Sequence, residues 1–556
     1  MAPFISLTPK NVSLLEEQGC TASDWSVVKI SPELDLSEIR HVRFSGPVSI
    51  EKGVTLRYIP GGISNCIVRE NATVENVDTI EFEPEATHGV GVMVSVLDET
   101  GSRAIPIFPG LSSQMATFMA RDPHWMKKIN DFSIRDFLDN KASKAEIGEG
   151  AIIKNCGTLK NVSVANEVII TGASILENGT IVNNAAPGKC ISYIGHGVQA
   201  KNFILEDGIL DSDASVTNCY IGQGATISHG FSAHDSLFFA NTSMENGEAH
   251  SLLAGPYTVS MHKGSLLISC QTSFMNAGST TNQSNHMYKL GPVHWGVLER
   301  GVKTASGSYL MLGAKIGAFS LLMGSHKTHP DSSEFPFSYL FGDERGATVV
   351  VPGVMLRSCG LLRDEMKWPT RDQRLKRKLP LHDHITFQVL NPMTVDRMLK
   401  AIPTIEELLT KPADDDLFMR YKGMKFTRAA LERAKSLYTL AIFKYLSVIL
   451  EDSSFPENDG VVPDEWIDLG GQILPRSFLE KARNTDTIPD AEEIFRDAFD
   501  NYDVLQKKWI GRRFGDWWRD RAEQIKFNAM RFDEMIEEDR QQYLQMLSRE
   551  ADMLML

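Results

Sequence analysis

Residues 147–181, IGEGAIIKNCGTLKNVSVANEVIITGASILENGTI, decide the fold of this chain. Read in sixes, with one slip of a single residue, each hexad begins with an aliphatic residue, and the residue four positions later is small in five of the six hexads. Such a period is typical of short parallel strands wound into a triangular prism, because the aliphatic side chain fills the interior and the small residue fits beside a tight corner. The leading residues are Ile147, Ile153, Leu159, Val164, Ile170 and Leu176, and the fifth residues are Ala151, Gly157, Ser163, Val168, Ser174 and Thr180.

This pattern resembles the hexapeptide repeat of left-handed parallel β-helices. Weaker copies with the same spacing flank it, and their leading residues are Val68, Val74 and Ile80 on one side and Leu310, Ile316 and Leu322 on the other. The resemblance implies a left-handed parallel β-helix with loop insertions. Apolar spacing in the last part of the chain predicts that an all-helical C-terminal region follows it, so the expected fold class is mainly β plus α.

The chain divides into three predicted parts. Residues 1–45 form an N-terminal cap that covers the open strand edge of the first coil, and residues 46–384 form the repeat region. The largest insertion, residues 84–145, contains an apolar strand around 90–96 and a helical section over 112–140. Residues 385–556 carry apolar residues at spacings of three and four, which predicts helices. The last helical piece, about 45 residues long, is expected to pack on the prism or on a neighbouring subunit.

Composition limits the function classes. The 556 residues carry a formal net charge of −14, so nucleic acid is an unfavourable partner. The chain has no apolar run of the roughly 18 residues that span a bilayer, and its first residues lack a basic start followed by an apolar run. We therefore expect a cytoplasmic protein without a membrane partner. The seven cysteines form no Cys-x-x-Cys pair, which fits neither a disulfide framework nor a zinc finger.

Histidines gather in one part of the chain. Eight of the fourteen lie between residues 229 and 329. Histidine is the side chain that titrates nearest neutral pH, so the cluster indicates a site, although ring nitrogens that satisfy backbone groups produce the same clustering. His326 is the most specific candidate, because it occupies the fifth position of a hexad, which the repeat reserves for a small residue.

Thr328, His329 and Pro330 resemble a Thr-His-Pro step of hexapeptide-repeat O-acetyltransferases of the galactoside and maltose type. The resemblance implies that His329 is a general base that takes a proton from an acceptor hydroxyl, with acetyl-CoA or another acyl-CoA as donor. His326 is the second candidate for the base.

Other polar residues of the stretch 274–336 could complete such a site. Asp331 could orient a histidine, and side-chain amides could donate hydrogen bonds to the oxyanion that forms at a thioester carbon. The asparagines have a structural alternative, since asparagine also forms ladders and left-handed corners in solenoid turns. The predicted substrate-binding residues are Asn276, Asn282, Asn285, His286, His294 and Asp331.

The stretches SNHMYKLGPVHWGVLERG and HKTHPDSSEFPFSYLFG resemble an uncharacterised bacterial family of hexapeptide-repeat proteins labelled as putative sugar-1-phosphate nucleotidyltransferases. Nucleotidyltransferases of that group begin with a glycine-rich GxGTRLxP-like loop, and no stretch of this chain matches it. We therefore do not expect a nucleotide-binding domain.

Two further groups of residues could bind ions. The sequence His382-Asp383-His384 could ligate a metal, but no further ligand lies at a diagnostic spacing, so no metal site is predicted. A basic run precedes the helical region in a chain that is otherwise acidic, and it could hold a phosphate group or be a solvated linker. The run consists of Arg371, Arg374, Lys376, Arg377 and Lys378.

Two hypotheses follow. The first is an acyltransferase that acts on a sugar, a nucleotide sugar or a similar hydroxylated small molecule. The second is a non-catalytic carbohydrate-binding or assembly scaffold in which the histidines are structural. The family resemblance implies a homo-oligomer, with a trimer favoured.

Overall fold

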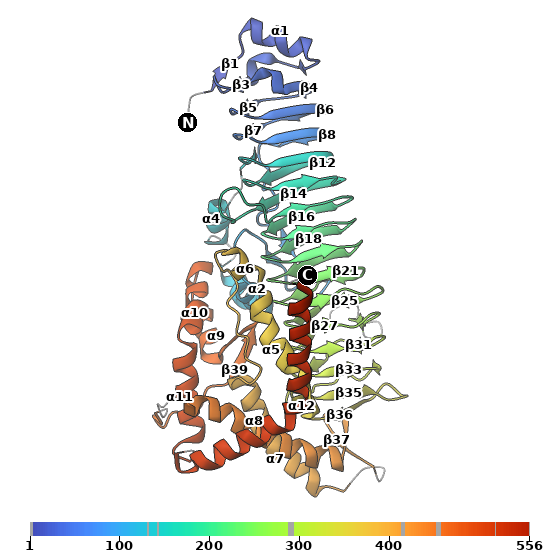
Figure 1. Cartoon of the computed structure of the whole chain (residues 1–556), viewed down its shortest axis with the longest axis vertical. Helices are drawn as coiled ribbons and strands as arrows, with labels where there is room; N and C mark the ends of the chain where they lie inside the picture. Colours follow the sequence, from blue (N-terminus) through green and yellow to red (C-terminus); the bar gives the residue numbers. More distant parts are fainter. Residues whose placement is uncertain are drawn as a thin grey trace.

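The computed structural model describes residues 4–129, 133–141, 144–286, 294–412, 417–451, 457–517 and 519–554. A parallel β-solenoid of about 17 turns spans residues 21–341, and a helical region follows it (Figure 1). The predicted fold class, a parallel β-helix with insertions and a helical C-terminal region, is therefore confirmed.

The N-terminal cap is shorter than the predicted residues 1–45. It consists of β1 (Ile5–Ser6) and α1 (Pro9–Glu17), and the Thr8 side chain caps α1 by accepting a hydrogen bond from the Asn11 amide. Short 3₁₀ turns at Trp25–Val27 and Leu36–Glu38 follow, but solenoid strands already begin at Thr21.

The solenoid strands are short and pair in parallel with the strands one turn before and after them. In chain order they are β2 (Thr21–Ala22), β3 (Val28–Ile30), β4 (Ile39–Phe44), β5 (Val48–Ile50), β6 (Thr55–Ser64), β7 (Cys66–Val68), β8 (Thr73–Glu81), β11 (Glu146–Ile147), β12 (Ile152–Val164), β13 (Ile169–Thr171), β14 (Ile175–Val182), β15 (Tyr193–Ile194), β16 (Gln199–Glu206), β17 (Ile209–Leu210), β18 (Ser215–Ile221), β19 (Thr226–Ser228), β20 (Ser232–Phe238), β21 (Ser243–Glu245), β22 (Glu248–His250), β23 (Leu253–Ala254), β24 (Val259–Ser260), β25 (Leu266–Ile268), β26 (Cys270–Thr272), β27 (Asn276–Ala277), β28 (Asn282–Ser284), β29 (Gly296–Leu298), β30 (Lys303–Thr304), β31 (Tyr309–Met311), β32 (Lys315–Ile316), β33 (Leu321–Met323), β34 (Ser325–His326) and β35 (Tyr339–Gly342).

The strands form three faces, which we name by what lies on them. The histidine face contains the first halves of β18 and β20, followed by β22, β25, β28, β31 and β34. The covered face contains the second halves of β16, β18 and β20, followed by β23, β26, β29 and β32. The groove face contains β17, β19, β21, β24, β27 and β30.

The hexad residues occupy the positions that the repeat predicts. All six leading residues of 147–181 are at most 2% exposed and belong to the solenoid core. The small fifth residues have a steric reason, which Gly157 illustrates. A Cβ atom at Gly157 would lie 2.2 Å from the carbonyl oxygen of Ser174 in the next coil.

Asparagines form a ladder at the corner between the histidine face and the covered face. Asn178, Asn202 and Asn218 all have left-handed backbone, with φ of 50°, 52° and 53°. The Asn178 amide donates to Asn202 at 2.7 Å, and the Asn202 amide donates to Asn218 at 2.9 Å. Each side chain thus joins two coils at a position where few residue types other than glycine and asparagine adopt the backbone conformation without strain.

The predicted insertion covers one face of the solenoid. It contains β9 (Met93–Val94), β10 (Ile105–Pro106) and the helices α2 (Ser113–Arg121), α3 (Pro123–Ile129) and α4 (Ser133–Asn140). Its apolar side chains form a second core with the outward-facing residues of the covered face, which are Ile204, Tyr220, Leu237 and Leu253.

The C-terminal region was predicted to be all-helical. It is mainly helical but also contains short strands. Beyond the solenoid, β36 (Thr348–Val351) pairs antiparallel with β35 and parallel with β38 (Met424–Thr427), which forms a hairpin with β37 (Phe418–Tyr421). A second hairpin joins β39 (Trp466–Leu469) and β40 (Gln472–Pro475). The helices are α5 (Cys359–Arg371), α6 (Gln373–Arg377), α7 (Pro392–Thr410), α8 (Arg428–Glu451), α9 (Arg476–Arg483), α10 (Ile488–Asp500), α11 (Tyr502–Phe514) and α12 (Ala522–Leu554).

The final helix is shorter than the predicted 45 residues, because α11 and α12 are separate. Helix α12 has 33 residues, packs mainly on α8 and α5, and returns the C-terminus to the side of the solenoid (Figure 1). It therefore packs within the chain, one of the two predicted alternatives.

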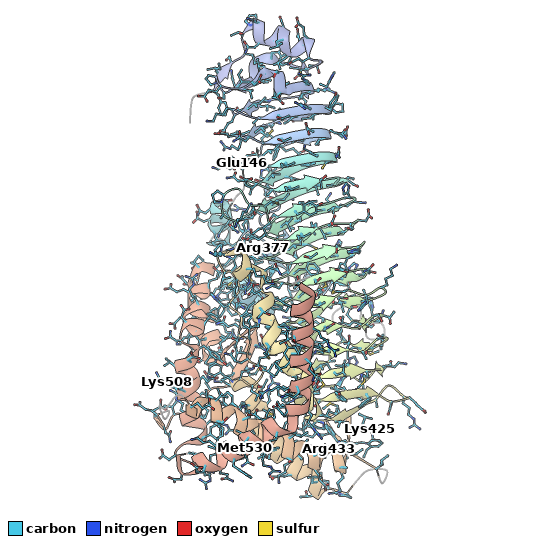
Figure 2. All side chains as sticks on the ribbon, in the orientation of Figure 1. Glu146, Arg377, Lys425, Arg433, Lys508 and Met530 are labelled. Atoms are coloured by element: carbon cyan, nitrogen blue, oxygen red, sulfur yellow. The ribbon has the colours of Figure 1, made fainter. Side chains whose placement is uncertain are left out.

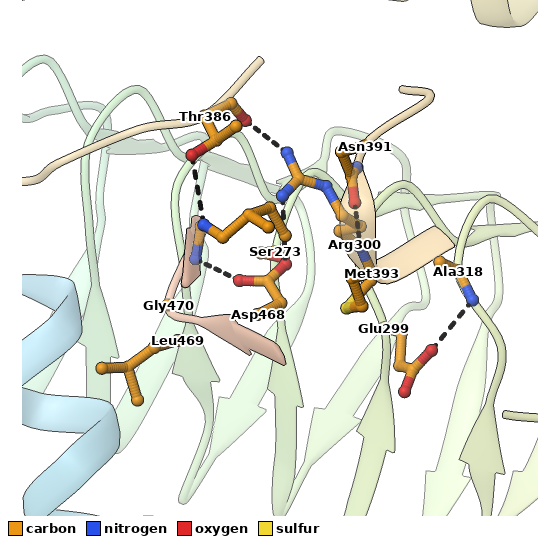
Figure 3. A network of polar contacts seen from close by, with 12 residues as sticks. Ser273, Glu299, Arg300, Ala318, Thr386, Asn391, Met393, Asp468, Leu469 and Gly470 are labelled. Carbon is orange, nitrogen blue, oxygen red and sulfur yellow. Dashed lines mark hydrogen bonds and ion pairs between the residues drawn. The ribbon is translucent and has the colours of Figure 1, made fainter. Parts of the chain in front are cut away.

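A buried arginine connects the solenoid to the C-terminal region (Figure 3). Arg300 is 0% exposed and donates a hydrogen bond to the Thr386 carbonyl oxygen. Its guanidinium lies 3.7 Å from the Asp468 carboxylate of β39, which also accepts a hydrogen bond from Ser273 at 2.9 Å. Residues far apart in the sequence thus share one polar network.

Candidate functional site

His326 lies inside the solenoid. It pairs with Leu310 on the histidine face and is 0% exposed, so the position of the side chain is in the prism interior and not at a corner as the hexad register predicted. Its Nδ1 atom lies 2.9 Å from the Thr348 hydroxyl, and its Nε2 atom has no hydrogen-bond partner among the described residues. Burial lowers the pKa of His326 to about 4, so the imidazole is neutral at pH 7 and is screened from any ligand in solvent.

His329 occupies the corner where the sequence placed His326. Its backbone is left-handed, with φ of 48°, and its side chain is partly exposed. Nδ1 lies 2.6 Å from the Leu312 carbonyl oxygen. Because a carbonyl accepts only from a protonated nitrogen, Nδ1 carries a proton, and in the neutral ring Nε2 is the atom with the lone pair. The ring of His294 lies 6.3 Å from that of His329, so these two predicted residues are together.

The other predicted residues do not complete a site around His329. Asn285 is buried and donates to Glu99 at 2.6 Å and to Ser269 at 2.9 Å, while His286 is exposed where the described chain ends before residues 287–293. Asp331 accepts a 2.6 Å hydrogen bond from the Ser333 hydroxyl, and no hydrogen bond or ion pair joins it to a histidine among the described residues. Asn282 is exposed on the histidine face and Asn276 on the groove face, on different sides of the prism.

Asn276 lines a groove of about 550 Å³ between the groove face and the helices α5 and α6. Figure 1 shows these helices lying lengthwise beside the solenoid. The floor of the groove is one row of outward-facing residues on neighbouring coils. Six rungs at about 4.8 Å each make the row about 24 Å long. Its members are Ile209, Thr226, Ser243, Val259, Asn276 and Lys303.

The wall of the groove is cationic. Arg363, Lys367 and Arg371 follow one another at i, i+4 and i+8 on α5, which places them on one side of the helix at intervals of about 6 Å. Arg377 of α6, labelled in Figure 2, extends the wall toward the N-terminal coils. Trp368 lies among these cations and gives the wall one aromatic surface.

Only part of the positive charge is neutralised within the chain. Lys303 and Arg363 both pair with Asp364, the latter at 3.2 Å. Arg371 and Arg377 have no ion-pair partner among the residues that the structure describes. The groove therefore holds two arginines that are available to an anionic ligand.

Buried contacts hold α6 in place at one end of the groove. Asp372 pairs with Arg374 at 2.8 Å and accepts a hydrogen bond from Asn241 of the solenoid at 3.1 Å. Gly224 lies so close to α6 that a Cβ atom there would be 2.8 Å from the Cβ of Gln373. Arg374 thus belongs to the anchor, and of the predicted basic run only Arg371 and Arg377 line the groove.

An aromatic column supports the groove along the corner between the covered face and the groove face. Tyr257 and Phe274 stack with centroids 5.4 Å apart, and Phe319 and Phe337 stack at 5.3 Å. Arg300 lies between the two pairs, 4.8 Å from the Phe274 ring and 6.0 Å from the Phe319 ring. Tyr257 donates to the Trp368 carbonyl oxygen at 2.8 Å, which fixes α5 against the column.

A second, smaller cavity of about 70 Å³ contains His382 and His384. His382 lies 2.9 Å from Glu206, a buried carboxylate that also accepts from the Tyr220 hydroxyl at 2.9 Å. Although burial opposes it, this carboxylate raises the pKa of His382. Within the described ranges, no three histidine, cysteine or acidic side chains are arranged to hold a metal ion.

Sequence reasoning missed Arg363, Lys367 and Trp368. Their signal was present, because cations at i, i+4 and i+8 mark one charged side of a helix. The surface that these residues face could not be inferred from the sequence, because the floor of the groove comes from coils about 60 to 150 residues earlier in the chain.

Comparisons with known proteins give a family but no characterised relative. No curated protein matches the chain. No helix of the described residues is long and apolar enough to cross a membrane. A family model described as a domain of unknown function, DUF4954, matches residues 4–66 and 49–409, which include nearly the whole solenoid, α5 and α6. The chain therefore belongs to the DUF4954 family.

Proposed function

We propose that this protein binds an anionic carbohydrate in the groove between the groove face and α5–α6, without catalysing a reaction there. One observation carries the proposal: Arg371 and Arg377, which have no ion-pair partner in the described part of the chain, line the groove over a floor that offers hydroxyl and amide groups. Arginine binds carboxylate and phosphate in a bidentate manner, and Thr226, Ser243 and Asn276 can exchange hydrogen bonds with sugar hydroxyls.

The composition of the groove also favours binding over catalysis. No histidine occurs among the described residues that line it. Asp207, an acid at its end, is fully buried and accepts hydrogen bonds from Asn184 and Gln223, so it is committed to the structure. Asp364, the other acid of the lining, is held in ion pairs by Lys303 and Arg363, so the described lining can hold a ligand but offers no carboxylate or imidazole that is free to act as a base.

Calorimetric titration with glucose 1-phosphate and UDP-glucose tests the proposal. The double variant Arg371→Gln/Arg377→Gln is expected to weaken binding at least tenfold, because a hydrogen bond to a charged group contributes about 1.5–3 kcal/mol. Lys376→Gln/Lys378→Gln is the matched control, since both lysines are exposed, neither lines the groove, and the pair removes the same two positive charges. Equal affinity in the wild type and the double variant would contradict the proposal.

A second candidate function is the acyltransferase activity that the Thr-His-Pro resemblance implies. The observation that favours it is the free Nε2 of His329 beside His294 at the corner. In this proposal Nε2 takes the proton of a sugar hydroxyl that attacks an acyl-CoA thioester, and a homotrimer completes the site. Thiol release from acetyl-CoA in the presence of a sugar panel is expected to fall at least a hundredfold in His329→Gln. An unchanged rate in that variant, or no release by the wild type, would rule it out.

A further inference from the structure

The groove has the form of a track. Its floor repeats with the coils, about every 4.8 Å, and runs over six of them from Ile209 to Lys303. A monosaccharide phosphate would occupy only one or two rungs of that row. A floor that repeats at a fixed spacing along the solenoid axis therefore favours a ligand that is itself extended along that axis.

The wall repeats in the same direction. Asp364 of α5 meets Lys303 at one end of the groove, and Gln373 of α6 meets Asn241 toward the other, so α5 and α6 run antiparallel to the progression of the coils. Arg363 and Arg371 are separated by eight residues of helix, about 12 Å. Side chains that extend straight out from these two positions hold their guanidinium groups about 12 Å apart. Lys303 and Arg363 share the single carboxylate of Asp364, so that end of the groove keeps one net positive charge, and the wall fits several anionic groups spaced along a chain better than it fits one.

Trp368 and the hydroxyl groups of the floor point to sugar units between those charges. The Trp368 ring packs on Phe274 with centroids 4.5 Å apart, and the part of the indole that lines the groove can pack on the apolar face of a pyranose ring, while Thr226, Ser243 and Asn276 meet its hydroxyls. A flexible polyphosphate would use the cations but not these groups.

We infer that the occupant of the groove is a linear acidic oligosaccharide, such as a chain of uronic acid units, lying parallel to the solenoid axis with its carboxylates on the cations of α5 and α6. This inference rests on the proposed function, since it specifies the anionic carbohydrate bound in the same groove.

Oligogalacturonates of one, two, four and six units, titrated into the full chain, test the inference. Affinity is expected to rise at least a hundredfold from one unit to the length that fills the groove and then to level off. Hexagalacturonate methylated on its carboxyl groups serves as the uncharged control and is expected to bind at least a hundredfold more weakly than the acid.

Variants at the two ends of the α5 wall distinguish a track from a single subsite. Arg363→Gln and Arg371→Gln are each expected to weaken hexagalacturonate binding about tenfold, whereas at most one of them affects the monomer. Lys376→Gln is the control for the loss of one positive charge, and the thermal midpoint of each variant verifies folding.

The results distinguish a failure of the linear-ligand inference from a failure of the proposed function. A flat length series, together with arginine-dependent binding of sugar phosphates, would overturn the linear ligand and leave the proposed function standing. Failure of every oligogalacturonate, glucose 1-phosphate and UDP-glucose to bind the folded wild type would overturn both.

Discussion

A single side chain, His326, shows how a buried residue adds a pH dependence to the fold. Its row on the histidine face also includes Leu267 and Leu310, both inside the prism. Taking a charged imidazole into that interior is costly, which is why the pKa falls to about 4 from an ordinary 6.5. In the unfolded chain the same imidazole takes up a proton below about pH 6.5.

We therefore predict that His326 destabilises the fold as the pH falls from about 6.5 to about 4. The pKa of His326 is lower in the folded chain than in the unfolded chain, so unfolding takes up a proton in this pH window. The free energy of unfolding is therefore highest above about pH 6.5 and falls as the pH falls. Between pH 7 and pH 5 the loss is about 2 kcal/mol. In His326→Gln, which has no titrating group, urea unfolding midpoints should lack this part of the pH dependence. An identical pH dependence in the two proteins would refute the assignment.

At the scale of elements, the corners of the solenoid restrict the choice of residue as strongly as its strands do. The asparagine ladder and the aromatic column are both made of residues with left-handed backbone, Asn202 and Phe274 among them. Asparagine adopts this conformation more readily than other non-glycine residues and its amide reaches the next coil, whereas phenylalanine must be held there by stacking.

Substitution of Asn202 separates the two contributions of a corner asparagine. Asn202→Gly loses the hydrogen bonds to Asn178 and Asn218 but tolerates the left-handed backbone. Asn202→Ala loses the same bonds and also bears the left-handed strain, about 1–2 kcal/mol. We expect the alanine variant to unfold at lower urea concentration than the glycine variant. If alanine were equally stable, the backbone conformation would not be what selects asparagine here.

For the molecule as a whole, the C-terminal region helps to build the groove. Helices α5 and α6 form its wall, Tyr257 holds α5, and Arg300 joins the aromatic column to Asp468 of the second hairpin. Because all these parts meet at one corner of the prism, the groove depends on contacts between segments that are distant in sequence.

Removal of Arg300 should loosen this connection. Arg300→Met keeps an apolar chain between the rings but leaves the Asp468 carboxylate without its cation, so the free energy of unfolding is expected to fall by about 3–5 kcal/mol. The double variant Arg300→Met/Asp468→Asn removes the unpaired charge and should recover part of the loss. Unfolding midpoints measure both effects, and no recovery in the double variant would show that the ion pair does not matter.

The sequence alone determined the solenoid, its insertion and the helical character of the C-terminal region. It could do so because hexad periodicity is a local property: Ile153 or Leu176 is directed inward by its position in the repeat alone. The same logic failed at His326, which the hexad register placed at a corner: it pairs with the inward-facing Leu310 and lies in the interior, and His329 occupies the corner instead.

Only the tertiary structure decided the candidate site. Thr226, Asn276 and Arg371 line one groove because the coils stack at a fixed spacing and α5 lies along one face of the solenoid. A short stretch of sequence does not determine which coil lies beside which helix. Likewise, Arg371 and Arg374 are indistinguishable within the basic run, yet Asp372 and the solenoid bury one and leave the other facing the groove. Local periodicity specifies which way a side chain points, whereas docking of distant segments specifies what it meets.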